Sequence, residues 1–303
     1  MTETSGVFIV DKPAGMTSAG LTNILKRLLK VKKIGHSGTL DPFATGVMVC
    51  CTGQATRLSR FFLAGTKSYE AVMVLGVATD TQDATGTVTA VSGETNFPEE
   101  VVSEVLARFM GESLQAPPVY SALKHEGVPL YRLAREGRPV QKPARPIHIS
   151  EIRLIDMNLP EVRFQVTCSA GTYIRTLCTD MGTLLGCGAH LKELRRTEAC
   201  GFGIGEAVSL EALQELAEEG RAFERMISMS DALKGLPEVV ATPAVAEKIR
   251  YGRPVLKTDL GVDLRNGERY IKIVDRDRCL IAVLTMDEDK SAYDYGCVMG
   301  PER

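Results

Sequence analysis

One carboxylate, that of Asp41, lies in a stretch whose other residues are glycine, proline, histidine, small hydroxyl and apolar residues, GHSGTLDPFATGV at residues 35–47. The proline after it biases its backbone toward an extended conformation, and the glycines permit a tight loop that a ligand can approach closely. An aspartate in such a place often only caps a turn. Taken alone, the stretch therefore leaves a turn cap and a reacting carboxylate as alternatives.

A second stretch, GTYIRTL at residues 171–177, supplies a group that could act on such a carboxylate. Its pattern indicates a strand that leads into a helix and presents Tyr173 and Arg175 on the same side. An arginine beside a carboxylate in a partly dry pocket keeps the carboxylate ionised and orients it, as a carboxylate nucleophile requires. We therefore expect Asp41 and Arg175 to form a reacting pair.

Signatures of other catalytic sites are missing from the sequence. It contains no HExxH, GxSxG or P-loop motif and no aspartate-rich metal cluster. GFGIG at residues 201–205 is more typical of a strand bend than of a nucleotide loop. The four histidines lack the spacing of paired metal ligands and are expected to be structural or hydrogen-bonding: His36, His125, His148 and His190. We therefore expect neither a metal site nor a cofactor.

The elements that must position these groups follow from the spacing of apolar residues. Helices are predicted at residues 21–28, 102–109 and 177–185, and strands at residues 69–77 and 162–168. Thr17 or Ser18 is expected to cap the first helix, and Gly186 or Gly188 to end the last. Because strands and helices do not alternate regularly, we predict an α+β fold with a mixed, largely antiparallel sheet.

The last part of the chain has a different character. A boundary is plausible near residues 230–242, and RYIKIVDRDRCLIAVL, at residues 269–284, is typical of a hairpin with a charged turn. One helix is expected near residues 244–251. We predict a large domain at residues 1–235 and a small, β-rich domain at residues 236–303.

The charges are clustered, although 36 basic and 38 acidic residues give a net charge of −2. One cluster is Lys26, Arg27, Lys30, Lys32 and Lys33, and the other is Lys124, Arg132, Arg135, Arg138, Lys142 and Arg145. A run of charges is usually no more than a solvated face. Two basic clusters that flank the unusual Asp41 stretch nevertheless favour a nucleic-acid surface.

The sequence also indicates the cellular compartment of the protein. The eight cysteines include no CxxC pair, which argues against structural zinc and a disulfide framework. The N-terminal stretch MTETSGVFIV lacks the features of a secretory signal, and no segment approaches the roughly 18 apolar residues that span a bilayer. We expect a cytoplasmic protein without membrane contact.

Seven blocks carry a resemblance to a known family: VDKPAGMTS, GHSGTLDPFATGV, KSYEA, TDTQDATG, PPVYSALKHEGVPLYRLAREGR, GTYIRTL and GCGAHLKELRR. In this order, over most of residues 7–200, they resemble the TruB family of tRNA pseudouridine synthases. The C-terminal part resembles the family's small PUA-like RNA-binding domain only loosely. The resemblance implies isomerisation of uridine 55, in the T loop of tRNA, to pseudouridine after base flipping, and this reaction needs no cofactor.

The resemblance also implies roles for three catalytic residues. Asp41 matches the essential aspartate, which attacks the sugar or the base, or assists departure of uracil; the sequence leaves these routes open. Tyr69, in KSYEA, matches the tyrosine that stacks on the target base and is the candidate for removing the C5 proton. Arg175 matches the arginine that pairs with the aspartate.

Five further residues are implied to bind the substrate. Tyr173 and Leu194 match residues that line the uracil pocket. His36 matches a histidine that supports the flipped-out loop, and Asp83 matches a residue that helps to hold the extruded nucleotides. Lys12, in VDKPAGMTS, is assigned to the same substrate-binding set.

Two alternatives to the synthase are an RNA-binding or tRNA-folding factor with an incidental pocket, and a nucleoside hydrolase that releases uracil with the same carboxylate. The acidic balance, and a C-terminal tail without the Lys-rich stretch of eukaryotic relatives, favour a stand-alone enzyme of the bacterial type. We therefore expect tRNA as the partner, no obligate protein partner and a monomer.

Overall fold

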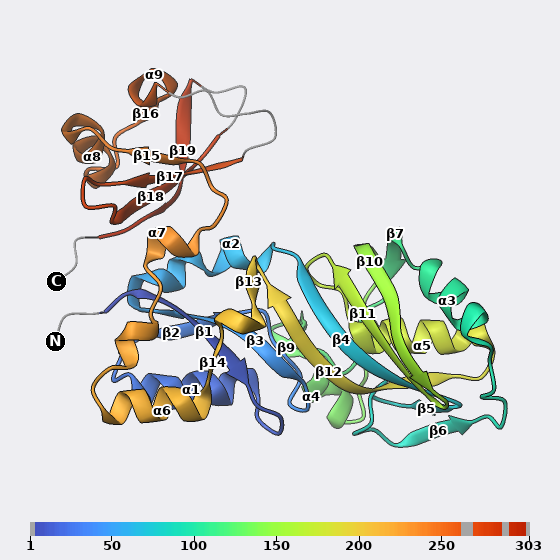
Figure 1. Ribbon diagram of the computed structural model, residues 1–303. Coiled ribbons are helices and arrows are strands. Elements are labelled where there is room, and N and C mark those ends of the chain that lie inside the picture. Colours follow the sequence, from blue (N-terminus) through green and yellow to red (C-terminus); the bar gives the residue numbers. More distant parts are fainter. Residues whose placement is uncertain (1–3, 262–268, 287–290, 301–303) are drawn as a thin grey trace.

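The computed structural model describes residues 4–261, 269–286 and 291–300 and is dominated by one sheet of ten strands (Figure 1). The main path of the sheet is β14 (Val208–Ser209), β1 (Gly6–Lys12), β3 (Thr45–Thr52), β12 (Ala189–Ala199), β4 (Lys67–Leu75), β11 (Glu161–Cys168), β10 (Arg145–Asn158) and β7 (Gly111–Gln115). In addition, β2 (Ile34–Ser37) pairs with β3, and β13 (Phe202–Gly203) pairs with β12. Within this sheet β1 runs parallel to β14 and β3 parallel to β12, while the other pairs are antiparallel. The predicted α+β fold with a mixed, largely antiparallel sheet is confirmed.

Helices cover the sheet in two places. Helices α3 (Glu99–Ala107) and α5 (Ile174–Leu185) pack at the β4, β11 and β10 end, and α1 (Ser18–Leu28) and α6 (Leu210–Glu218) lie at the β1 end (Figure 1). The predicted cap of the first helix and the predicted end of the last are confirmed, because the Thr17 side chain accepts a hydrogen bond from the backbone N–H of Gly20 and Gly186 ends α5 with a φ of 80°, whereas α1, α3 and α5 each begin before the predicted first residue. Each helix thus places an apolar face on the sheet.

Short elements connect these layers. They are η1 (Gly53–Leu58), α2 (Ser59–Leu63), β5 (Val77–Thr79), β6 (Val88–Val91), β8 (Lys124–His125), β9 (Val128–Pro129), α4 (Leu130–Arg135), η2 (Ile204–Glu206), η3 (Ala222–Arg225) and α7 (Met229–Ala232). Within the described residues, the stretch between β7 and β10 holds only the small hairpin β8–β9 and the short helix α4.

A second sheet is built from the C-terminal part of the chain. Its order is β15 (Glu238–Val240), β17 (Tyr270–Val274), β18 (Leu280–Thr285), β19 (Ala292–Val298) and β16 (Val255–Leu256), with helices α8 (Pro243–Arg250) and α9 (Lys257–Leu260) beside it. The hairpin β17–β18 and helix α8 confirm the sequence prediction, whereas the short helix α9 had no clear apolar periodicity to predict it. The division at residue 235 and the PUA-like character of this part stay predictions.

The two sheets share one apolar cluster. Val274, Leu280 and Val283 of the second sheet belong to the same buried cluster as Val7 and Phe62 of the first part of the chain. Beside them, the rings of Phe61 and Tyr270 meet edge to face with centroids 5.1 Å apart, and Gln54 exchanges two hydrogen bonds with the backbone of Gly300. The C-terminal sheet therefore docks on η1 and α2 through buried contacts.

Within the described residues, the helices are too short or too polar to span a membrane.

Candidate active site

The loop that carries Asp41 connects β2 to β3 and is fastened to α1. The Ser18 hydroxyl donates to the carbonyl of Leu40 at 3.0 Å and accepts from its N–H at 2.8 Å. On the other side of Asp41, the carbonyl of Pro42 accepts from the N–H of Gly15 at 2.9 Å. These contacts fix the backbone on both sides of the carboxylate.

Arg175 is brought to Asp41 by the first turn of α5. Its Nε lies 2.9 Å from Oδ2 of Asp41, and its Nη2 donates to Oδ1 at 3.4 Å. The same guanidinium donates to the carbonyl of Thr81 through Nη1 and to that of Tyr120 through Nη2, at 2.9 and 2.8 Å. The Arg175 side chain is 5% exposed. The predicted proximity of the two residues is found, and the two carbonyls leave the guanidinium little freedom to turn away from Asp41.

The charge of Asp41 is set by opposing influences. Burial raises the pKa of the Asp41 carboxyl, Arg175 acts against that rise, the nearby Asp83 adds to it, and Lys12 lowers it. The Asp41 side chain is still 34% exposed, so solvent reaches the carboxylate and moderates the cost of its charge. A carboxylate of this kind is open on one side and held by a fixed cation on the other.

Asp83 lies at the centre of the Thr-rich turn after β5. Its Oδ1 accepts hydrogen bonds from the hydroxyls of Thr81 and Thr85 and from the N–H of Thr85, at 2.6–2.9 Å. Its Oδ2 lies 3.6 Å from Nη1 of Arg175. Asp83 is 4% exposed. The structure thus brings Asp83 to the Asp41–Arg175 pair, while its predicted contact with extruded nucleotides stays a prediction.

Tyr69 and Leu194 come from the neighbouring strands β4 and β12. They are 7% and 8% exposed and belong to the same apolar cluster as Leu40 and Ala44, which flank Asp41. Burial raises the pKa of the Tyr69 hydroxyl, and the adjacent Arg196 acts in the opposite direction. An aromatic ring and a leucine therefore border the Asp41 loop, as a pocket for a planar base requires.

Arg196 is a site residue that the sequence reasoning missed. It is fully buried and faces Tyr69 across the β4–β12 pair. Its Nε donates to the carbonyl of Val47 at 2.6 Å and its Nη2 to that of Gly38 at 3.2 Å, so one side chain holds both ends of the Asp41 loop. Among the described residues, no carboxylate lies within 4.0 Å of this guanidinium. Strand alternation could have indicated this residue, because it places residue 196 on the same face of its strand as Leu194.

Lys12 and His36 are both set back from open solvent. Lys12 is fully buried, and its Nζ donates to the carbonyls of Pro13, Met16 and Pro42 at 2.7–3.2 Å. Burial lowers the pKa of Lys12 to about 8. Burial likewise lowers the pKa of His36, with Arg196 contributing, so the imidazole is neutral at neutral pH. The predicted contacts of both residues with substrate stay predictions; the structure gives Lys12 a role in holding the carbonyl next to Asp41.

Tyr173 is placed differently from the expectation. A turn at residues 169–172 separates β11 from α5, and Tyr173 caps the helix instead of continuing a strand. Its ring packs under the guanidinium of Arg145 at 5.2 Å. Its backbone exchanges two hydrogen bonds with the Gln115 side chain, and its place in the uracil pocket stays a prediction.

No group of three His, Cys, Asp or Glu residues with metal-binding geometry occurs in residues 4–261, 269–286 and 291–300. The charged groups that act on Asp41 are instead one carboxylate, Asp83, one guanidinium, Arg175, and one ammonium, Lys12. The arrangement can hold a reacting carboxylate next to the apolar cluster that contains Tyr69 and Leu194.

Comparison with known proteins gives two family matches. Residues 26–174 match the N-terminal domain of the TruB family of pseudouridylate synthases, and residues 175–234 match the tRNA pseudouridylate synthase B C-terminal domain. The boundary between the two matches falls directly before Arg175. The two matches together contain Asp41, Tyr69, Asp83, Arg175, Leu194 and Arg196, whereas Lys12 and Ser18 lie before the first match.

Individual relatives agree with these matches. The chain is 43% identical over 282 residues to tRNA pseudouridine synthase B of Geobacter sulfurreducens, covering 92% of each chain. It is 45% identical over 250 residues to the protein of the same name from Syntrophotalea carbinolica, covering 82% of this chain and 81% of the relative. Among solved structures, a Cbf5-Nop10-Gar1 complex is similar with a TM-score of 0.77 and 26% identity, covering 98% of this chain and 85% of that one.

Proposed function

The chain belongs to the TruB family of pseudouridylate synthases, and we propose that it isomerises uridine 55 in the T loop of tRNA to pseudouridine. The observation that carries the proposal is the pair formed by Asp41 and Arg175, whose Oδ2 and Nε lie 2.9 Å apart, on a loop whose Leu40 and Ala44 share a buried apolar cluster with Tyr69 and Leu194. The names of the relatives from Geobacter sulfurreducens and Syntrophotalea carbinolica support tRNA as the substrate.

The reaction is balanced within the nucleotide itself. The bond between the sugar C1′ and N1 of uracil breaks, the base turns within the pocket, and a bond forms between C1′ and C5. The proton on C5 is then lost and N1 is left protonated, so no electron or group is exchanged with another molecule. We assign the role of nucleophile to Asp41, on the sugar or on the base, and the removal of the C5 proton to Tyr69.

Base flipping must precede this chemistry, because Asp41 cannot reach a stacked nucleotide. Extrusion costs a few kcal/mol. Stacking on the ring of Tyr69 can return about 1–3 kcal/mol. Phosphate contacts with the two basic clusters can supply the remainder in a salt-dependent way. Recognition of this kind depends on the shape of the RNA loop more than on base edges.

The electrostatics of the pair suit a carboxylate nucleophile. Arg175 is held in place by the carbonyls of Thr81 and Tyr120, so it faces Asp41 before substrate arrives. A preorganised cation of this kind stabilises the ionised carboxylate without having to reorganise during the reaction. The remaining exposed side of Asp41 is the side from which a nucleotide can enter.

We further propose that the chain acts without an obligate protein partner, as a monomer in the cytoplasm. The test is incubation of the purified full chain, alone, with an unmodified T-loop stem-loop and with a matched stem-loop that has cytidine at position 55. Pseudouridine-specific chemistry should detect product at position 55 of the first RNA only. Binding without product would favour an RNA-binding factor, and free uracil would favour hydrolysis; either result overturns the proposal.

A further inference from the structure

The stretch between β7 and β10 is held at both ends to the turn that precedes α5. We call residues 116–144 the basic segment, because they contain Lys124, Arg132, Arg135, Arg138 and Lys142. The residues that flank it, Gln115 and Arg145, are directly opposite each other in the β7–β10 pair. Both of them contact the turn at residues 171–173, where the chain enters the helix that carries Arg175.

Gln115 makes two hydrogen bonds to one residue of that turn. Its Nε2 donates to the carbonyl of Tyr173 at 3.0 Å, and its Oε1 accepts from the N–H of Tyr173 at 2.8 Å. Gln115 is 4% exposed, so its amide is shielded from water that could replace these bonds. Since Tyr173 caps α5, the amide fixes the position at which the helix begins.

Arg145 holds the other side of the same turn. Its Nη2 donates to the carbonyl of Gly171 at 2.5 Å, and its guanidinium lies 5.2 Å from the centre of the Tyr173 ring. A Cβ at residue 171 would lie 2.9 Å from this nitrogen, and the φ of Gly171 is +87°. Glycine at this position therefore permits the close approach.

A third contact reaches Arg175 directly. Near the start of the basic segment, the carbonyl of Tyr120 accepts from Nη2 of Arg175 at 2.8 Å. The segment thus contacts Arg175 directly through the Tyr120 carbonyl, while its flanking residues Gln115 and Arg145 hold the turn that precedes Arg175. Among the described residues, the other hydrogen bonds and ion pairs of the Arg175 side chain are with Thr81, Asp41 and Asp83.

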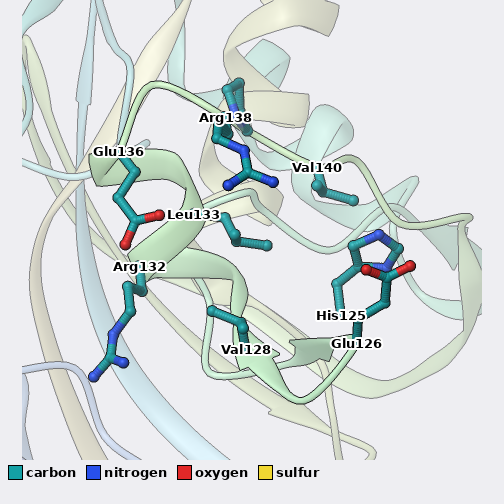
Figure 2. A pocket seen from close by; sticks show the side chains of 9 residues that line it. His125, Glu126, Val128, Arg132, Leu133, Glu136, Arg138 and Val140 are labelled. Carbon is teal, nitrogen blue, oxygen red and sulfur yellow. The ribbon is translucent and has the colours of Figure 1, made fainter.

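The basic segment carries five cationic side chains against two glutamates, an excess of positive charge that suits contact with phosphate. Helix α4, the hairpin β8–β9 and the stretch after α4 surround a cavity of about 490 Å³, bordered by Arg132, Arg138 and His125 and by the carboxylates of Glu126 and Glu136 (Figure 2). This cavity is lined entirely by residues 125–140 and is distinct from the Asp41 site. A bound phosphate chain on this surface would constrain the segment, and the three contacts above would pass that constraint to α5.

We propose that Gln115 is a positioning residue that couples the basic segment to Arg175, so that the segment held by RNA also holds the arginine against Asp41. The inference rests on the proposed function, because it concerns the same reaction. It makes Gln115 a residue that acts on the rate of the chemical step through Arg175 without touching the substrate.

The test compares Gln115→Ala with Gln141→Ala in the full chain. Gln141 is exposed, and its amide donates to the carbonyls of Pro117 and Lys142, both within the same segment. Because small displacements of a reacting group can cost about 100-fold in rate, Gln115→Ala should slow single-turnover pseudouridine formation at saturating stem-loop by about tenfold or more. Its RNA dissociation constant should change by less than about threefold, and Gln141→Ala should react within about twofold of wild type.

A pH profile separates positioning from general loss of structure. Asp41 is faced by Arg175 from α5, by Asp83 from the turn after β5 and by Lys12 from β1. If Gln115→Ala loosens Arg175, the Asp41 carboxyl loses part of the effect that lowers its pKa. The acid limb, which is the fall of the single-turnover rate as the pH is lowered, then moves to higher pH. A purely structural defect lowers the melting temperature and the active fraction, but leaves that limb in place.

Gln115→Met provides the same measurement if the alanine variant does not fold. It keeps the length of the side chain and adds no charge, but it removes both hydrogen bonds to the backbone of Tyr173. A slowed step with a shifted acid limb in either variant supports the inference. A wild-type rate with an unmoved limb, or a loss of rate matched by an equal loss of RNA affinity, overturns it. Absence of pseudouridine with the wild-type chain would instead overturn the proposed function.

Discussion

Nε of Arg175 lies 2.9 Å from Oδ2 of Asp41, across 134 residues of sequence, and two backbone carbonyls hold the same guanidinium from its other side. The planar guanidinium of Arg175 therefore donates to three different acceptors, one carboxylate and two carbonyls. A point cation on a flexible stem could satisfy one of them but not all three.

Arg175→Lys is therefore expected to lower the single-turnover rate about 100-fold or more, because both the ion pair and its orientation are lost. The rate is measured on the T-loop stem-loop at saturating protein. Arg163→Lys is the matched control, since Arg163 is exposed on the strand β11. Equal rates for the two variants would show that the orientation of the cation does not matter.

Asp41→Asn is expected to abolish pseudouridine formation, because a neutral amide cannot act as the nucleophile. RNA affinity should stay within about tenfold of wild type, since most of the binding energy comes from phosphate contacts and stacking elsewhere. Product analysis and a fluorescence titration with labelled stem-loop check the two parts. An Asp41→Asn variant that still turns over would remove Asp41 from the chemistry.

The single-turnover rate should fall as pH is lowered through the pKa of Asp41. Since burial raises that pKa, the acid limb should lie above the range of an ordinary aspartate. Asp83 raises the pKa of Asp41 further, so Asp83→Asn should move the limb to lower pH while keeping the Oδ1 acceptor of the turn. The pH–rate profiles of both proteins, measured in buffers of constant ionic strength, give the direction of the shift. A shift of the acid limb to higher pH in Asp83→Asn would contradict the assigned effect of Asp83 on the pKa of Asp41.

Arg196→Gln is expected to destabilise the protein, because the carbonyls of Val47 and Gly38 are left without their buried donor. Each unpaired buried acceptor costs about 1–3 kcal/mol. Arg195→Gln is the control next to it in sequence: Arg195 pairs with Asp11 at 2.7 Å but its side chain is 41% exposed. Such a pair is worth about 0–1 kcal/mol. Urea unfolding of both variants gives the difference, and similar losses would mean that the buried contacts of Arg196 contribute little.

Gly46→Ala tests the close approach of β3 to β12 beside the Asp41 loop. A Cβ at residue 46 would lie 2.2 Å from the carbonyl oxygen of Arg196, and the φ of Gly46 is +105°. Gly111 also has a positive φ, +89°, but open space where its Cβ would be. Gly111→Ala should cost about 1–2 kcal/mol of unfolding free energy from backbone strain alone. Gly46→Ala should cost about 3 kcal/mol or more, because strands must also separate; equal costs would exclude the steric contribution.

The parts of this fold that follow from local patterns could be predicted. The alternation of VRFQVTC specified β11, helical spacing specified α1, α3 and α5, and Gly186 marked the end of α5. Asp41 and Arg175 could be paired because their residue types suit one another chemically. Their neighbour Arg196 was missed, because an arginine in a strand is usually exposed and its burial depends on the strand register.

No pattern in the sequence could have predicted the contacts that orient Arg175. The carbonyls of Thr81 and Tyr120 are backbone atoms, which every residue type carries, so only the folded chain shows that they converge. The same holds for the amide of Gln115, whose partner is the backbone of Tyr173. Tyr173 was expected on the same side as Arg175 where a strand leads into a helix; it caps that helix, α5, and its ring lies against Arg145.

The apolar cluster that the two sheets share ties the C-terminal sheet to the strand that pairs with the Asp41 loop's own strand. Val274, Leu280 and Val283 lie in one buried cluster with Val7 of β1 and Val47 and Val49 of β3, so removal of the C-terminal sheet would expose apolar surface on the strands that lead into the Asp41 loop. Truncation before β15 is consequently expected to cost stability in the part of the chain that carries Asp41.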